Sequence, residues 1–184
     1  NTALHSNGSL TVNFYDDKGR VIQVSAGNYK GGTDVVTNRY NFINKVVCNY
    51  LVHNNASGNT NNLRVKTNMG YDAAGRLKTI TKQLNDDAST KRLISRVEYD
   101  ATGQMKRKQI GQKTAVDNTA MEDQSYAYNI RGWLKGINWS YGSTPTSSQV
   151  NIQNSKWFGM DLSYDWGFSN NQYNGNIGGS RWVN

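Results

Sequence analysis

Hydrophobic and polar residues alternate along much of this chain, which is the pattern of half-buried β-strands. Residues two apart lie on the same face of a strand, so period-two alternation predicts one apolar and one polar face. The clearest runs are Val65, Thr67, Met69 and Tyr71; Trp133, Lys135, Ile137, Trp139 and Tyr141; and Leu162, Tyr164, Trp166 and Phe168. Leu77, Ile80 and Leu84 break the period, so we expect a β-bulge or a shifted register there.

A seven-residue pattern occurs five times between these runs. It consists of Tyr, then Asp or Asn, two variable residues, Gly or Asn, mostly a polar residue, and an aliphatic residue. The copies begin at Tyr15, Tyr40, Tyr71, Tyr99 and Tyr128, with spacings of 25, 31, 28 and 29 residues. Such regular spacing indicates a repeated supersecondary unit rather than a site that is used once.

Each copy has the chemistry of a tight hairpin turn. Its second residue, which accepts hydrogen bonds from the backbone ahead, is Asp16, Asn41, Asp72, Asp100 or Asn129. Its fifth residue, for which we expect positive φ in a G1 bulge, is Gly19, Asn44, Gly75, Gly103 or Gly132. Asn also tolerates positive φ, so Asn44 fits the same turn. The tyrosines are interpreted as strand residues that pack on their neighbours.

Polar stretches alternate with these turns, which predicts an all-β antiparallel meander of ten to twelve strands with almost no helix. The stretches are 26–38, 52–62, 85–92, 112–124 and 142–149. Motif turns then fall on one edge of the sheet and longer loops on the other. We expect a single domain, with five hairpin repeats in 1–142 and a divergent Trp-rich terminal unit of the same sheet in 143–184. A sheet this wide is expected to twist strongly or curl, as part of a spiral shell or barrel-like wall.

Composition narrows the class of protein. Only 36% of the 184 residues are hydrophobic, so the core must be thin, but 11 Tyr and 5 Trp argue against disorder. Cys48 is the single cysteine, which excludes an internal disulfide and a thiolate metal cluster. We find no membrane-spanning apolar run and no signal peptide. The chain lacks an initial Met and opens in a strand-like segment, so we expect it to be excised from a longer protein.

Positive charge is concentrated in the middle of the chain. Of the net charge of +8, residues 61–113 contribute a surplus of 7, from 12 Lys or Arg against 5 acids. A nucleic-acid groove also needs stacking aromatics, and this stretch has only the motif residues Tyr71 and Tyr99. We therefore interpret the lysines and arginines as solvated strand faces and protected edges, and expect no nucleic-acid partner.

The motif resembles the YD repeat of the RHS family, most closely at Tyr71-Asp72-Ala73-Ala74-Gly75-Arg76-Leu77. The resemblance covers roughly residues 10–142, and Tyr164-Asp165-Trp166-Gly167 through Tyr173-Asn174-Gly175-Asn176-Ile177 looks like a divergent last unit. It implies a secreted or cell-surface bacterial protein whose repeats wind a β-sheet into a hollow shell, which in such families commonly encloses a toxin or presents an adhesive surface. The family's Asp-Pro self-cleavage motif is absent: Pro145 is the only proline and has no Asp beside it.

Catalytic groups are sparse. Cys48 and His53 are five residues apart, which is no recognised nucleophile–base signature. Glycoside hydrolysis needs two carboxylates, and the candidates are Glu122 or Asp123 with Asp161 or Asp165. Calcium could bind at Asp16-Asp17 or Asp86-Asp87, although neither has EF-hand spacing. Three Asn-x-Ser sequons, at Asn7, Asn55 and Asn138, are interpreted as chance. We expect no enzyme, no metal site and no cofactor.

Carbohydrate binding is the alternative function. All five tryptophans fall in the last 52 residues, and exposed aromatic faces flanked by Asn and Gln stack on sugar rings. The candidate sugar-binding residues are Trp133, Trp139, Tyr141, Trp157 and Trp166. Packing on the inner face of the sheet is the competing explanation for them.

The sequence therefore predicts a non-enzymatic repeat segment that builds a β-sheet wall, or else a carbohydrate-binding or adhesion module. The expected partners are adjoining repeats or domains of the parent protein, cell-surface glycans, and a second copy paired through the open edges of the sheet.

Overall fold

Twelve antiparallel strands make up the described part of the chain, which is residues 10–55, 62–112, 119–139, 157–166 and 171–183 of a computed structural model. The strand order follows the sequence from β1 to β12. One short 3-10 turn, η1 (Ala88–Thr90), lies between β6 and β7. The predicted all-β meander of ten to twelve strands is confirmed.

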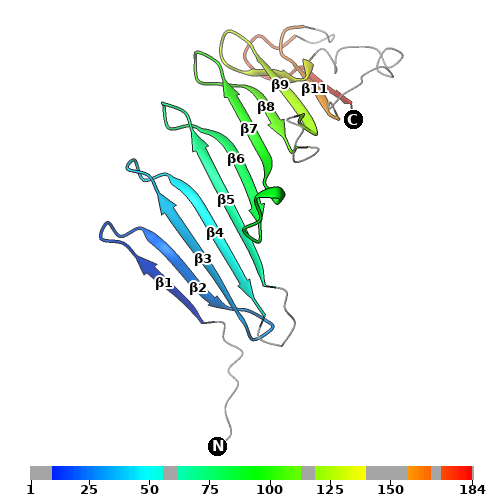
Figure 1. The fold of residues 1–184 in the computed structure, drawn as a ribbon. Coiled ribbons are helices and arrows are strands. Elements are labelled where there is room, and N and C mark those ends of the chain that lie inside the picture. Colours follow the sequence, from blue (N-terminus) through cyan, green and yellow to red (C-terminus); the bar gives the residue numbers. More distant parts are fainter. Residues whose placement is uncertain (1–9, 56–61, 113–118, 140–156, 167–170, 184) are drawn as a thin grey trace, which may run out of the picture. The chain divides into compact units, whose positions relative to one another are not determined.

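The chain divides into two compact units, residues 1–92 and 93–184. Figure 1 colours their strands along the sequence, from blue at β1 toward red at the C-terminal end. The first holds β1 (Thr11–Tyr15), β2 (Val21–Gly27), β3 (Thr33–Tyr40), β4 (Val46–Asn54), β5 (Leu63–Tyr71) and β6 (Leu77–Leu84). The second holds β7 (Arg92–Tyr99), whose first residue falls in the first unit, β8 (Met105–Ile110), β9 (Glu122–Tyr128), β10 (Leu134–Ile137), β11 (Gly159–Ser163) and β12 (Gly179–Val183). Curling of the sheet into a spiral or barrel-like wall stays a prediction.

The strands of the first unit place an apolar row on one face. Paired residues of neighbouring strands share a face, and the pairs join Val24, Val36, Leu51, Val65 and Leu84 across β2 to β6. The adjacent row, on the opposite face, is Gln23, Thr37, Tyr50, Lys66 and Gln83. One row on the first face is therefore apolar and the adjacent row on the opposite face is polar, while other pairs, such as Val35 with Val52, depart from this division.

The irregularity at Leu77, Ile80 and Leu84 is a bulge, as expected. Leu77 pairs with Tyr71, but the next pair joins Thr79 to Gly70, so Lys78 is the extra residue. Beyond the bulge, Ile80 and Leu84 pair with Met69 and Val65 and return to the apolar face.

Few side chains are fully buried. The buried apolar residues among those described are Val97, Ala120 and Tyr164, and all three belong to the second unit. The apolar row of the first unit is only partly buried, and Leu84 remains 42% exposed. The thin core predicted from composition is therefore found.

Several strand boundaries differ from the predicted ones. β2 and β3 extend through most of the polar stretch 26–38, because its Thr and Asn side chains lie on strand faces that are not fully buried. β10 ends at Ile137 and does not reach Trp139. Asn138, which follows Ile137, has φ of 48°. β11 ends at Ser163, so Tyr164 and Trp166 lie beyond the strand that their alternation predicted. Tyr141 and Phe168 lie outside the described residues.

Candidate functional site

The five motif turns have one hydrogen-bond pattern. In each, the Asp or Asn side chain accepts from the backbone N–H two and four residues ahead, as Asp72 does from Ala74 and Arg76 at 3.0 and 2.8 Å. The same pair of bonds is made by Asp16, Asn41, Asp100 and Asn129. These side chains are therefore occupied by the turn backbone, as predicted.

The fifth position of every turn has positive φ. The values are 72° at Gly19, 62° at Asn44, 75° at Gly75, 89° at Gly103 and 80° at Gly132. Each turn closes a bulged hairpin in which the motif Tyr pairs with the aliphatic seventh residue. The G1-bulge prediction is confirmed at all five copies.

Motif tyrosines link successive repeats through their hydroxyl groups. Tyr71 Oη donates to the Val46 carbonyl at 2.8 Å, and Val46 is the seventh residue of the preceding motif. Equivalent bonds join Tyr40 to Val21 at 2.9 Å, Tyr128 to Met105 at 2.9 Å and Tyr164 to Leu134 at 3.0 Å. The sequence pattern accounted for the ring packing of these tyrosines but missed this role of the hydroxyl.

These hydroxyls bond carbonyls that lie beyond the end of the backbone hydrogen-bond ladder. The β4–β5 pairing ends at Cys48 and Asn68, two residues short of Val46. The β2–β3, β8–β9 and β10–β11 pairings likewise end two residues short of Val21, Met105 and Leu134. A half-buried carbonyl needs a donor, and a phenol supplies it where a Phe could not.

Side chains in the turns also reach the next turn. Arg20 donates to Asn44 Oδ1 at 2.8 Å, and Gln104 donates to the Gly132 carbonyl at 3.0 Å. In both pairs the sixth position of one motif bonds the fifth position of the following motif. The motif therefore encodes contacts between repeats as well as its own turn.

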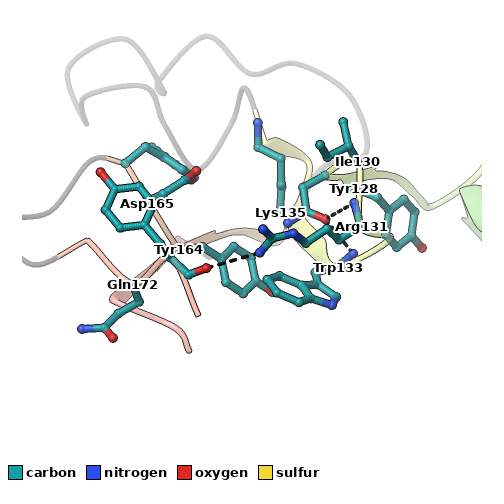
Figure 2. Close-up of a pocket in the computed structure, with 11 residues that line it drawn as sticks. Tyr128, Ile130, Arg131, Trp133, Lys135, Tyr164, Asp165 and Gln172 are labelled. Atoms are coloured by element: carbon teal, nitrogen blue, oxygen red, sulfur yellow. Dashed lines mark hydrogen bonds between the residues drawn. The ribbon is translucent and has the colours of Figure 1, made fainter. Parts of the chain in front are cut away.

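A cavity of about 410 Å³ lies in the second unit, at the edge that carries the motif turns (Figure 2). Its walls come from the fifth turn, the start of β10, the segment after β11, and the connection to β12. The lining residues are Tyr128, Asn129, Ile130, Arg131, Trp133, Lys135, Tyr164, Asp165, Trp166, Gln172 and Tyr173. The cavity combines five aromatic rings with charged and amide groups, which is the composition of a small-ligand site.

The aromatic walls are fixed by mutual contacts. Trp133 and Tyr164 have ring centroids 5.3 Å apart at 41°, and Trp139 meets Trp166 edge-on at 5.9 Å and 66°. A Cβ at Gly175, where φ is 98°, would lie 2.5 Å from the Trp133 ring, so only glycine lets this indole take its place. Tyr164 and Gly175 therefore fix the position of the Trp133 ring.

Two of the predicted sugar-binding residues line this cavity, namely Trp133 and Trp166. Trp139 contacts the Trp166 ring but is absent from the lining, and Trp157 is 64% exposed and also absent from it. Tyr141 lies outside the described residues. The structure thus brings together part of the predicted set.

The sequence analysis missed the polar residues of the cavity, chiefly Arg131, Lys135 and Gln172. Lys135 carried a usable signal, because period two places it on one strand face with Trp133. Arg131 and Gln172 carried none, since Arg131 is a variable position of the fifth motif turn and Gln172 lies in the connection between β11 and β12.

The carboxylates considered for hydrolysis have separate structural partners. Glu122 is 7% exposed and accepts from the Trp157 backbone N–H at 2.6 Å and from Asn138 Nδ2 at 3.4 Å. Burial raises its pKa, against the effect of these hydrogen bonds. Asp123 pairs with Arg107. These contacts hold the neighbouring elements of the second unit together.

The remaining two candidates differ in exposure. Asp161 is fully buried and accepts from Arg181 Nε at 3.0 Å, while its other oxygen, Oδ1, has no partner within the described structure. Asp165 is exposed at the cavity.

Asn138 organises the core of the second unit. It is fully buried, and its side chain accepts from the Ser125 N–H at 2.9 Å and donates to the Phe158 carbonyl at 2.8 Å. It therefore joins β9 to the segment before β11, just where β10 ends.

Other chemistry considered from the sequence has structural explanations too. Cys48 and His53 are five residues apart in β4, so their side chains lie on opposite faces, and His53 Nδ1 lies 2.5 Å from Asp34 Oδ1. Asp86 accepts from Tyr50 at 2.7 Å, and Asp87 caps η1. Within the described residues no group of three or more His, Cys, Asp or Glu side chains could hold a metal ion.

No helix in the described part of the chain is long and apolar enough to cross a membrane.

Comparison with known proteins gives no assignment. No family model matches the chain, and no curated protein matches it significantly.

Proposed function

We propose that this chain is a structural, non-enzymatic repeat segment of a secreted or cell-surface bacterial protein of the RHS, YD-repeat type. Its role is to build part of a β-sheet wall that curls into a spiral or barrel-like shell, such as one that encloses a toxin. Its partners are the adjoining repeats and domains of the parent protein.

The tyrosine hydroxyl bonds between repeats carry this proposal. Four of them, at Tyr40, Tyr71, Tyr128 and Tyr164, each join a hairpin to the one before it. A motif that serves repeat-to-repeat bonding and turn closure leaves few groups for a reaction. The half-buried apolar row from Val24 to Leu84 also suits a wall, because such a face needs an interior to cover it.

Protease protection of the full-length parent protein tests the wall. The hydroxyls of Tyr40, Tyr71 and Tyr128 are removed together by substitution with Phe, and Tyr29→Phe is the control, because Tyr29 is 99% exposed. We expect trypsin to cleave the triple variant within this segment faster than the wild type or the control. Equal protection of all three proteins would contradict a wall held together by these bonds.

A second candidate function, carbohydrate binding, is favoured by the cavity of about 410 Å³ with its five aromatic rings. Pyranose rings stack on indole and phenol faces while polar groups orient their hydroxyls. Here the rings are tilted rather than coplanar, which suits a single enclosed sugar unit more than a long flat chain.

A glycan array tests this second function. Trp166→Ala removes part of the cavity wall, and Trp182→Ala, a 68% exposed residue outside the cavity lining, is the control. We expect binding to be lost in the first variant and kept in the second. No binding across a broad array would leave the wall as the only role.

A further inference from the structure

Two cations line the cavity, and each lies against a tryptophan ring. The guanidinium carbon of Arg131 is 5.1 Å from the Trp133 ring centroid. Lys135 Nζ is 4.0 Å from the Trp139 ring centroid and 6.0 Å from that of Trp166. Cation–π contacts hold each charge in place without neutralising it.

Neither cation forms a salt bridge within the described structure, although several other arginines do. Arg20 pairs with Asp16, Arg76 with Asp72, Arg107 with Asp123 and Arg181 with Asp161. Asp165 also lines the cavity, yet no ion pair joins it to Arg131 or Lys135. The lining therefore has one negative and two positive side chains, and the positive ones are free to meet a ligand.

Arg131 is oriented for this role. Its Nη1 donates to the Tyr173 carbonyl at 3.3 Å, and Figure 2 draws the Arg131 side chain beside Trp133. A guanidinium has five N–H donors, so others remain for a planar acceptor. Carboxylates are recognised by two parallel N–H groups of Arg, and the planar guanidinium stacked on an indole keeps that geometry.

We propose that this cavity binds a carboxylated sugar unit, such as a uronic acid residue of an acidic polysaccharide; this rests on the proposed carbohydrate-binding function. The sugar ring packs against Trp133, Tyr164 and Trp166. Its carboxylate bonds Arg131 and is attracted by Lys135.

Two polar groups at the cavity are available to bond the hydroxyls of a sugar. The indole N–H of Trp166 is buried and has no hydrogen-bond partner within the described residues, so an acceptor is missing beside the cavity wall. The amide of Gln172 also lines the cavity and can both donate and accept. A sugar hydroxyl suits both groups, because it accepts from the indole N–H and can both donate to and accept from the amide.

Calorimetric titration with tetragalacturonic acid and its methyl ester tests this inference, because the two probes differ in charge but not in ring structure. We expect the free acid to bind about tenfold more tightly than the ester, as the loss of one charge-assisted hydrogen bond implies. Arg131→Gln and Lys135→Gln should each reduce that ratio toward one.

Lys78→Gln is the control for non-specific attraction to a chain of net charge +8, because Lys78 is exposed in β6 of the first unit. It should leave the ratio unchanged. Equal binding of acid and ester, or an equal loss in Lys78→Gln, would overturn the acidic-sugar inference but leave sugar binding intact. If neither probe nor a panel of neutral tetrasaccharides binds, the carbohydrate-binding function itself fails.

Discussion

The Tyr71 hydroxyl donates a 2.8 Å hydrogen bond to the backbone carbonyl of Val46, 25 residues earlier in the chain. The ladder between β4 and β5 ends two residues before this carbonyl, so the side chain extends the pairing where the backbone does not. The relationship recurs at three further tyrosines, which makes it a property of the repeat.

Removal of that hydroxyl should weaken the protein measurably. We expect Tyr71→Phe to lower the free energy of unfolding by about 1 kcal/mol, because the partly buried Val46 carbonyl loses its donor. Urea denaturation followed by tryptophan fluorescence and circular dichroism measures the change. Tyr29→Phe, at an exposed loop position, should be neutral; equal effects of the two substitutions would show that the hydroxyl bond does not matter.

Asparagine replaces the turn glycine in one natural copy of the motif, and this allows a test of why the glycine is needed. Gly75 has φ of 75°, and a Cβ there would meet only Ile43 Cδ1 at 3.5 Å, so backbone strain rather than crowding sets the cost of substitution. Gly75→Val should cost about 1 kcal/mol or more, because a β-branched residue is strained at positive φ. Gly75→Asn should cost clearly less, because Asn44 occupies the equivalent position at 62°.

A matched glycine outside the turns completes this comparison. Gly27 has no atom within 4 Å of an added Cβ and no positive φ. Gly27→Ala should therefore leave the melting temperature unchanged or slightly raised. A drop as large as that of Gly75→Val would mean that general packing, and not the turn conformation, makes these glycines necessary.

Acid should destabilise the repeats through their turn aspartates. The Arg20 side chain lowers the pKa of Asp16, the Arg76 backbone N–H lowers that of Asp72, and the Thr102 hydroxyl lowers that of Asp100. A carboxyl whose folded pKa is below its ordinary value of 3.8 stabilises the fold above that pH. This contribution is lost as the pH falls through the folded pKa.

Substitution of the turn aspartates by asparagine removes the titrating carboxyl groups but keeps the turn geometry. Asn41 and Asn129 make the same two backbone bonds as the aspartates, without a charge. A triple variant with Asn at 16, 72 and 100 should therefore lose less melting temperature than the wild type between pH 6 and about pH 3. Thermal unfolding by circular dichroism measures it; an unchanged acid loss would place the titrating groups elsewhere.

The buried amide of Asn138 should be among the costliest side chains to replace. Asn138→Leu leaves the Ser125 N–H, the Phe158 carbonyl and the Glu122 carboxylate short of a partner. We expect a loss of about 2–4 kcal/mol in the free energy of unfolding, from several unsatisfied buried groups. Urea denaturation tests this, with Asn171→Leu, an exposed position, as the control. A loss below about 1 kcal/mol would contradict an organising role.

The repeats could be predicted because their turns and strands depend on residues that are close together in the sequence. Asp or Asn followed three residues later by Gly or Asn specifies both the side-chain bonds and the positive φ of the turn, as at Asp72 and Gly75. Between the turns, period two identified strands such as β5, and the break in that period indicated the bulge at the start of β6. These features depend on neighbours in the sequence, which is why they could be predicted.

The candidate site depends on distant contacts and could be predicted only in part. Trp133 stands out by composition, but its partner Tyr164 is 31 residues away and Gly175, which makes room for its ring, is 42 away. Buried Asn138 ends β10 early by adopting positive φ, although the alternation of its neighbours favours a longer strand. Tertiary packing outweighs the local pattern at these positions.

Cryo-electron microscopy of the full-length parent protein tests the wall most directly. The account predicts that these twelve strands lie within one continuous curled sheet, with the row from Val24 to Leu84 facing an enclosed interior and the Tyr71 hydroxyl on the Val46 carbonyl. A structure in which the segment stands apart as a separate module, with that row open to solvent or packed on a catalytic domain, would contradict it.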